Sequence, residues 1–246
     1  VTSSDSLGFN SATSYDSSFG YQDAFIARLD TAGKLNWFNY FGDTLNDIGL
    51  DIDVCGNLIH AVGYSEDAKR PNGGAPYISV GSSGGNSTYQ GQEDAFYVQL
   101  DTSGNIKKGF LFGGSSYDAF QSVYASGSGK IGLLGATRST SNISTISGSS
   151  KSSNSDADAM ILYMDTSGTH TWSRYFGGSA NENFYRDASG KDIAVKGGVV
   201  LNSKNEVFIT GTTYSSGIQQ QSSSGVCYKT YLNDGSVTGV SDAYLA

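Results

Sequence analysis

The sequence predicts an all-β fold of repeated units, because one stretch recurs three times along the chain. The stretch 23–42 (DAFIARLDTAGKLNWFNYFG) returns at 94–113 and at 158–177, with its opening Asp, its turn Asp and its closing Gly at the same spacing. Such self-similarity is typical of repeat architectures. The composition agrees, since 33 Gly, 16 Tyr, 12 Phe and only 2 Pro suit many short strands joined by tight turns.

The strands can be placed in order along the chain. Residues 1–22 are Ser/Gly/Asn-rich and are predicted to form a loop, and a hairpin is expected at 23–29 and 35–41. In its turn, Asp30 is placed to accept backbone N–H groups and Gly33 to supply a positive φ, as Asp101 with Gly104 and Asp165 with Gly168 do in the other copies. Further hairpins are expected at 48–54 with 58–63, at 120–126 with 130–135, and at 192–201 with 206–211. A degraded fourth copy is expected from Cys227, with 237–246 as its last strand.

Most of these strands are apolar on both faces, which indicates sheets that are covered on both sides. Blades of a β-propeller or layers of a solenoid meet this condition, whereas a sandwich exposed on one face would alternate apolar and polar residues. We therefore predict a β-propeller of four-stranded antiparallel blades, with strands a to d in each. The expected units are a half blade at 1–42 with strands c and d only, then blades at 43–113, 114–177 and 178–246, with first strands beginning near Ile48, Phe120 and Ile193. The tight turns are expected on one face, and the long b–c loops (64–93, 137–157 and 212–225) on the other.

The motif DAF-x-x-x-L-D-x-x-G-x-x-x-W-x-x-Y-F-G-G, followed by an apolar hairpin and a Ser/Thr-rich loop, resembles the SBBP family of β-propeller repeats. It is carried by 23–42 with Trp37, by 94–114, and by 158–178 with Trp172. The resemblance implies a secreted or surface protein built of propeller blades, usually without a defined enzymatic activity. The chain departs from the pattern in its long loops, in an insertion at 181–192, and in a fourth copy without the Asp-Ala-Phe opening.

Charge and hydropathy exclude several classes of partner. A formal net charge of −8 argues against nucleic acid and anionic membranes, which require clustered Lys and Arg. No apolar run approaches the length of about 20 residues that a membrane span needs. The opening VTSSDS is not a signal peptide, so we expect a mature chain or a piece of a longer one.

The chain offers few residues for catalysis, and we predict no catalytic, cofactor-binding or metal-binding residue. His60 and His170 are the only histidines; His60 matches Gly132 and Phe208 of the other copies and is expected in the core, whereas His170 follows a turn and is expected to be solvated. Neither belongs to a motif with a nucleophile and an orienting acid. Asp51 and Asp53 share one face of a strand, beside Asp47, so Ca²⁺ ligation is one reading and a solvated rim is the favoured one.

Five aromatic side chains recur at matching positions of strand d: Trp37, Phe41, Phe112, Trp172 and Phe176. They can form a stacking platform for sugar rings, or they can pack against the neighbouring blade. Repetition in register favours packing.

Two N-glycosylation sequons, at Asn86 and Asn142, fall in b–c loops and are predicted on one face of the domain, opposite Cys55. Cys55 lies in a turn and Cys227 at a strand start, at opposite ends of blades. A strand spans roughly 20 Å, beyond the roughly 7 Å that a disulfide bridges between Cα atoms, so we predict no bond between them.

Three hypotheses for function follow. The favoured one is a non-enzymatic extracellular or cell-surface β-propeller, a structural or adhesive module whose partners are other protein copies or surface glycans, with a homo-oligomer or filament as its assembly. The second is a lectin-like propeller that binds sugars through Tyr64, Tyr77, Tyr89 and Tyr214. The third and weakest is an enzyme with a carboxylate pair in the channel. Because the half blade lacks strands a and b, we also expect an a–b hairpin, from flanking sequence or from a neighbouring molecule, to complete it.

Overall fold

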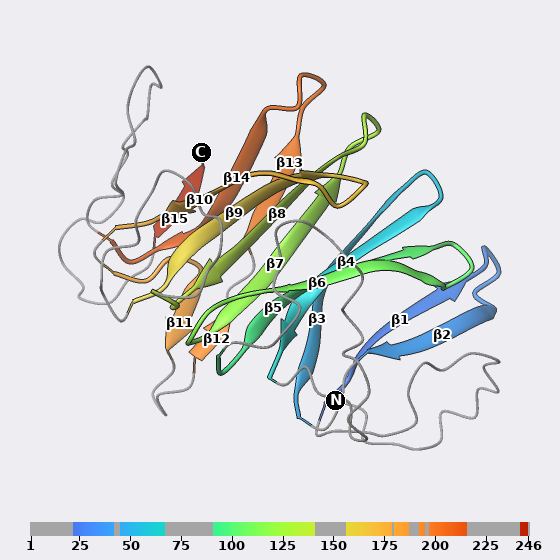
Figure 1. Cartoon of the computed structure of the whole chain (residues 1–246), viewed down its shortest axis with the longest axis horizontal. Coiled ribbons are helices and arrows are strands. Elements are labelled where there is room, and N and C mark those ends of the chain that lie inside the picture. Colours follow the sequence, from blue (N-terminus) through green and yellow to red (C-terminus); the bar gives the residue numbers. More distant parts are fainter. Residues whose placement is uncertain are drawn as a thin grey trace.

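A computed structural model of the chain describes residues 22–41, 45–66, 91–140, 156–178, 180–186, 192–194, 197–215 and 242–245. Every regular element in this part of the chain is a β-strand, which confirms the all-β prediction (Figure 1). Among these residues, no helix has the length and apolar character needed to cross a membrane.

The strands form antiparallel sheets in chain order. The first sheet has two strands, β1 (Ala24–Leu29) and β2 (Leu35–Phe41). The second has four strands: β3 (Asp47–Cys55), β4 (Leu58–Ser65), β5 (Asp94–Asp101) and β6 (Ile106–Phe112). The third also has four: β7 (Asp118–Ala125), β8 (Lys130–Thr137), β9 (Asp158–Asp165) and β10 (His170–Phe176). The last has three: β13 (Gly198–Leu201), β14 (Val207–Thr213) and β15 (Asp242–Leu245).

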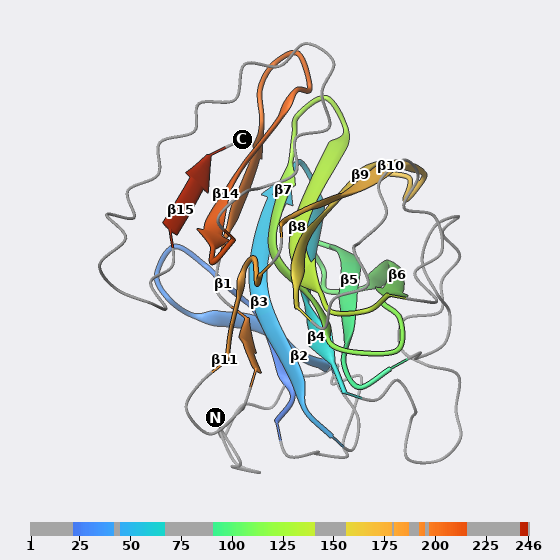
Figure 2. The same ribbon diagram turned by 90° about the vertical axis from the view of Figure 1, so that its left-hand side faces the viewer.

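The sheets stack face to face (Figures 1 and 2). Three large apolar cores and one small alanine cluster are found in the described residues. Ile26 of β1 packs with Leu100 of β5 in the first core, Tyr97 of β5 with Leu133 of β8 in the second, and Leu134 of β8 with Ile209 of β14 in the third. Both faces of β5 and β8 are therefore buried, as their continuous apolar sequences predict. The four-stranded antiparallel units are confirmed, but the described sheets form an open array rather than a closed ring.

The expected turn chemistry is confirmed. In the β1–β2 turn, Asp30 Oδ1 accepts hydrogen bonds from the backbone N–H of Ala32 and of Lys34, both at 2.9 Å. Asp101 repeats this in the β5–β6 turn. Gly33, Gly104 and Gly168 have φ of 79°, 88° and 81°, which a residue with a Cβ rarely adopts. Tight turns of successive sheets meet on one side of the stack, where Ser128 Oγ lies 2.6 Å from Asn205 Oδ1.

The fourth unit differs from the prediction. β15 pairs with β14, with Asp242 opposite Thr213, in the register that places Asp94 opposite Ser65 and Asp158 opposite Thr137. The residues at 242–245 (DAYL) are therefore a third strand that keeps the Asp-Ala-aromatic opening, and assigning 237–246 to a strand d was wrong. The proposed copy at Cys227 lies outside the described residues.

The first strand of this unit was also misplaced. Asp192–Ala194 forms strand β12, which pairs with β11 (Phe184–Arg186) in a separate hairpin. Glu182 instead pairs with Thr213, the position that Asp47 and Asp118 occupy in the other sheets. The insertion thus follows Asn183 rather than spanning 181–192. The insertion lies at the position where β3 and β7 each have a β-bulge. A bulge residue is not paired across the sheet, so extra residues can be inserted there while the pairing on both sides is kept.

Candidate functional site

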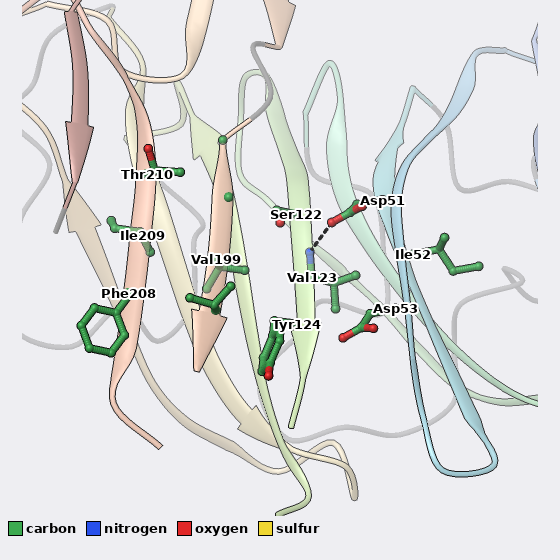
Figure 3. A pocket seen from close by; sticks show the side chains of 13 residues that line it. Asp51, Ile52, Asp53, Ser122, Val123, Tyr124, Val199, Phe208, Ile209 and Thr210 are labelled. Atoms are coloured by element: carbon green, nitrogen blue, oxygen red, sulfur yellow. Dashed lines mark hydrogen bonds between the residues drawn. The ribbon is translucent and has the colours of Figure 1, made fainter. Parts of the chain in front are cut away.

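A groove of about 390 Å³ lies along the first strands of three sheets (Figure 3). It runs between the edges of β3, β7 and β13, because these strands each lie at one end of the strand order of their sheet. Its lining consists of Asp51, Ile52 and Asp53 of β3, Ser122, Val123 and Tyr124 of β7, and residues of β13 and β14 that include Val200, Phe208 and Thr210.

Two carboxylates of the groove bind the backbone of the neighbouring sheet. Asp51 Oδ2 accepts a hydrogen bond from Val123 N at 3.0 Å, and Asp53 Oδ2 accepts one from Ala125 N at 2.7 Å. Figure 3 shows both side chains pointing from β3 toward β7, with Ile52 on the other side of the strand. These acceptors pair N–H groups on the outer edge of β7, where the described residues place no further strand, and they protect that edge. The favoured reading of Asp51 and Asp53 as a solvated rim is therefore wrong, since both are half-buried acceptors; Asp47, at the start of the same strand, is buried.

The groove offers hydrogen-bonding groups and apolar contact surface. Its carboxylates are engaged by backbone amides, and its hydroxyl groups come from Ser122, Tyr124 and Thr210. Its lining contains no histidine or cysteine that could serve as a base or nucleophile. In the residues that the structure covers, no three His, Cys, Asp or Glu side chains gather in the way a metal ion requires.

His60 lies in the core of the second sheet, as its match to Gly132 and Phe208 predicts. It is buried, and its Nδ1 lies 2.8 Å from the hydroxyl oxygen of Tyr97, which in turn accepts a hydrogen bond from Gln99 Nε2 at 3.4 Å. The Tyr97 hydroxyl and the imidazole Nδ1 share this hydrogen bond, and Nε2 is buried without a hydrogen-bond partner among the described residues. Desolvation by burial lowers the pKa of His60 to about 4, against a smaller opposing effect of Asp53.

This burial makes stability depend on pH. The unfolded chain takes up the proton near pH 6.5 and the folded chain only near pH 4, so the free energy of unfolding falls as the pH drops through that window. Between about pH 7 and pH 5, the wild type is expected to lose about 2 kcal/mol more than the variant His60→Phe. Urea unfolding of both proteins at the two pH values measures the difference. His170→Phe serves as the control and should keep most of the wild-type dependence; an equal dependence in wild type and His60→Phe would contradict the assignment.

A repeated pair of buried carboxylates, which sequence reasoning missed, lies where successive sheets meet. Side-chain oxygens of Asp94 and Asp118 both come within 3.0 Å of the point where a Cβ on Gly113 would lie. Asp158 and Glu182 frame Gly177 in the same way. The recurring Asp at the start of each copy and Gly at its end are the sequence pattern that could have predicted these pairs. Only glycine at that position leaves room for both carboxylates.

These carboxylates hold the crossovers between sheets. Asp118 Oδ2 accepts from Gly114 N at 2.8 Å and from Ser139 Oγ at 2.6 Å. Glu182 accepts from Gly178 N at 3.1 Å and from Thr213 Oγ1 at 2.7 Å, and burial raises the pKa of its carboxyl. Their observed contacts are structural.

The recurrent aromatics of strand d pack between sheets. Trp37 and Phe112 are buried in the cores, and the Trp37 indole N–H donates to the carbonyl of Thr102 in the next sheet at 3.0 Å. Trp172 is half-buried and stacks on Tyr163, with ring centroids 5.3 Å apart. Packing rather than a sugar platform therefore explains these three and the partly buried Phe176. The side chain of Phe41 lies outside the described part of the structure.

The remaining candidate residues do not gather into a site. His170 is half-exposed, with Nε2 3.2 Å from Ser173 Oγ, rather than fully solvated. Cys55 carries a free thiol whose sulfur lies 3.2 Å from the Ser126 carbonyl, while Cys227 lies outside the described residues. Tyr64 is half-buried, and desolvation raises its pKa to about 12; Tyr214 is also half-buried. Tyr77, Tyr89 and both sequon residues, Asn86 and Asn142, fall outside the described residues.

A scan against protein-family models finds no match to this chain, and a search of curated proteins finds none either. The resemblance to the SBBP repeats therefore stays a prediction.

Proposed function

We propose that this chain is a β-propeller-type structural or adhesive module of the SBBP kind, without enzymatic activity, that acts outside the cell or on its surface. One observation carries the proposal: the sheets are joined by the same contact at successive junctions. Arg28 Nη1 donates to the Thr102 carbonyl at 2.7 Å, and Gln99 Nε2, at the same position one sheet later, donates to the Thr166 carbonyl at 3.0 Å. A stack locked in this repeated way is a rigid scaffold.

The two sides of the scaffold carry different kinds of connection between strands. Tight turns lie on one side, while the chain between β4 and β5, between β8 and β9, and between β14 and β15 leaves the sheets at their other ends. These connections are long and Ser/Thr-rich, and two of them contain the sequons of Asn86 and Asn142. We assign contact with other proteins or surface glycans to this side, because variable loops on a rigid scaffold commonly carry binding.

The proposal is tested by adhesion of beads that carry the protein on their surface. We expect beads to bind cells, and binding to fall when residues 141–155 are replaced by a short Gly-Ser turn. The matched control is Ser122→Ala in the groove, which should leave adhesion unchanged. Circular dichroism confirms that both variants keep the β fold.

Two results would overturn this function. Equal adhesion with and without residues 141–155, and again with 67–90 and 216–241 replaced, would place binding elsewhere than on the loop side. Multivalent binding of the wild type to one class of sugar on a glycan array would favour the lectin-like alternative.

A further inference from the structure

Near the first end of the stack, the sheet of β3 to β6 exposes two side chains whose matches in the next two sheets are buried. Ile52 and Val54 of β3 are 51% and 57% exposed. The residues that match Ile52 in the next two sheets, Val123 and Val199, are 5% and 4% exposed. The matches of Val54 are equally buried: Ala125 and Leu201. In those sheets the preceding sheet covers these positions, so Ile52 and Val54 mark a place where the inner strands of another sheet fit.

The last end of the stack exposes a complementary pair. Val200 of β13 and Phe208 of β14 lie directly opposite each other and are 51% and 42% exposed. Tyr124 and Gly132 are the matching pair one sheet earlier. A Cβ on Gly132 would lie 2.7 Å from Leu201 Cδ1 and 3.0 Å from Val199 Cγ2, so this position faces the first strand of the following sheet.

The two ends therefore carry the two halves of one packing arrangement. Inside the chain, the positions of Tyr124 and Gly132 cover those of Val199 and Leu201. If a second molecule packs on the first as successive sheets pack within the chain, Val200 and Phe208 of one molecule contact Ile52 and Val54 of the other. The bulk of Phe208 in place of Gly132 is offset by the smaller Val200 in place of Tyr124.

We propose that a second copy of this chain docks head to tail on the first, with Val200 and Phe208 of one molecule covering Ile52 and Val54 of the other. The interaction continues the sheet-to-sheet packing seen within the chain. It buries four exposed apolar side chains, which favours association. It deepens the structural function proposed above, and rests on it, by naming the partner.

Backbone pairing gives this interface its register. The edge of β1 away from β2 is not paired by any strand in the described part of the chain. β1 follows Asp23 and begins Ala24-Phe25, the same opening that β15 uses when Asp242 pairs opposite Thr213. In the docked pair, β15 of the first molecule leaves the edge of β14, and β1 of the second copy pairs there in the same register. The joint sheet then takes its first two strands from one molecule and its last two from the other.

A heterologous contact of this kind closes into a ring or continues as a filament. We therefore expect light scattering to show concentration-dependent association of the wild type. The variants Ile52→Lys and Phe208→Lys each place a charge in the contact and should weaken association by about 100-fold, as substitutions at the centre of an interface do. Both sites are exposed in the single molecule, so unfolding temperatures should stay close to that of the wild type. Thr31→Lys, in an exposed turn, is the matched control and should associate like the wild type.

Mixing the two variants tests whether the contact joins opposite ends of two molecules. Each variant keeps one intact end, so an equal mixture of labelled Ile52→Lys and Phe208→Lys should form pairs that transfer fluorescence energy and grow no further. Each variant alone should give no transfer.

Three results would overturn the proposal: a wild type that is monomeric throughout, variants that still associate alone, or a mixture that forms no pairs. A monomer destabilised by Ile52→Lys would show instead that residues of the same chain cover β3. Cell adhesion reads the proposed function separately, so a monomeric wild type with loop-dependent adhesion overturns only the head-to-tail contact.

Discussion

Replacing Gly135 by alanine is expected to destabilise the protein by about 3 kcal/mol or more, at the upper end of what overpacking costs. Gly135 lies in β8 opposite Phe120, immediately before the bulge in β7. A Cβ there would come within 3.0 Å of the backbone carbonyl oxygen of Ala119, which has no rotamer that removes the collision. The two strands would have to separate at the junction between two cores.

Urea unfolding of Gly135→Ala measures this effect, and Gly127→Ala is the matched control. Nothing lies within 4 Å of a Cβ on Gly127, so its unfolding free energy should change by no more than about 0.5 kcal/mol. Gly63 occupies the same place in the preceding sheet, where a Cβ would meet the carbonyl of Ile48. Equal small changes at Gly135 and Gly127 would refute the close approach.

Replacing Asp118 by alanine is expected to cost about 3 kcal/mol, because it leaves two donors without their acceptor. The N–H of Gly114 and the hydroxyl of Ser139 both donate to Asp118 Oδ2 inside the protein. The gain from relieving repulsion with the nearby Asp94 reduces the loss without reversing it.

A double-mutant cycle separates the Ser139 contact from the rest. Ser139→Ala alone should cost about 1 kcal/mol. The double variant Asp118→Ala, Ser139→Ala should be less destabilised than the sum of the two single variants, because the hydroxyl is no longer left unpaired. Strict additivity, measured by denaturant unfolding, would show that this hydrogen bond does not couple the two residues.

Local chemistry made several features predictable from the sequence. The turn at Asp30 and Gly33 uses contacts within a few residues, so its geometry follows from the residues themselves. The core position of His60 agrees with its match to Gly132, whereas Phe208, at the same position of the last sheet, is 42% exposed.

The errors arose where register depends on a distant strand. The assignment of 237–246 to a last strand rested on a weak turn, whereas β15 is fixed by its pairing with β14. Likewise, 192–201 reads as one apolar strand, and only the pairing of Asp192 with Arg186 shows that it divides. No feature of the nearby sequence predicts that β15 pairs with β14 or that Asp192 pairs with Arg186.

The sequence by itself determined the all-β class, the repeat and the tight turns, because each depends on residue type and spacing along the strand. Only the tertiary structure decided which groups meet across sheets. Asp51 reads from sequence as a surface acid or a metal ligand, and it becomes the acceptor for Val123 N only when two sheets stack. Ile52 reads as one more buried strand residue, yet it is exposed, since burial depends on whether a neighbouring sheet is present.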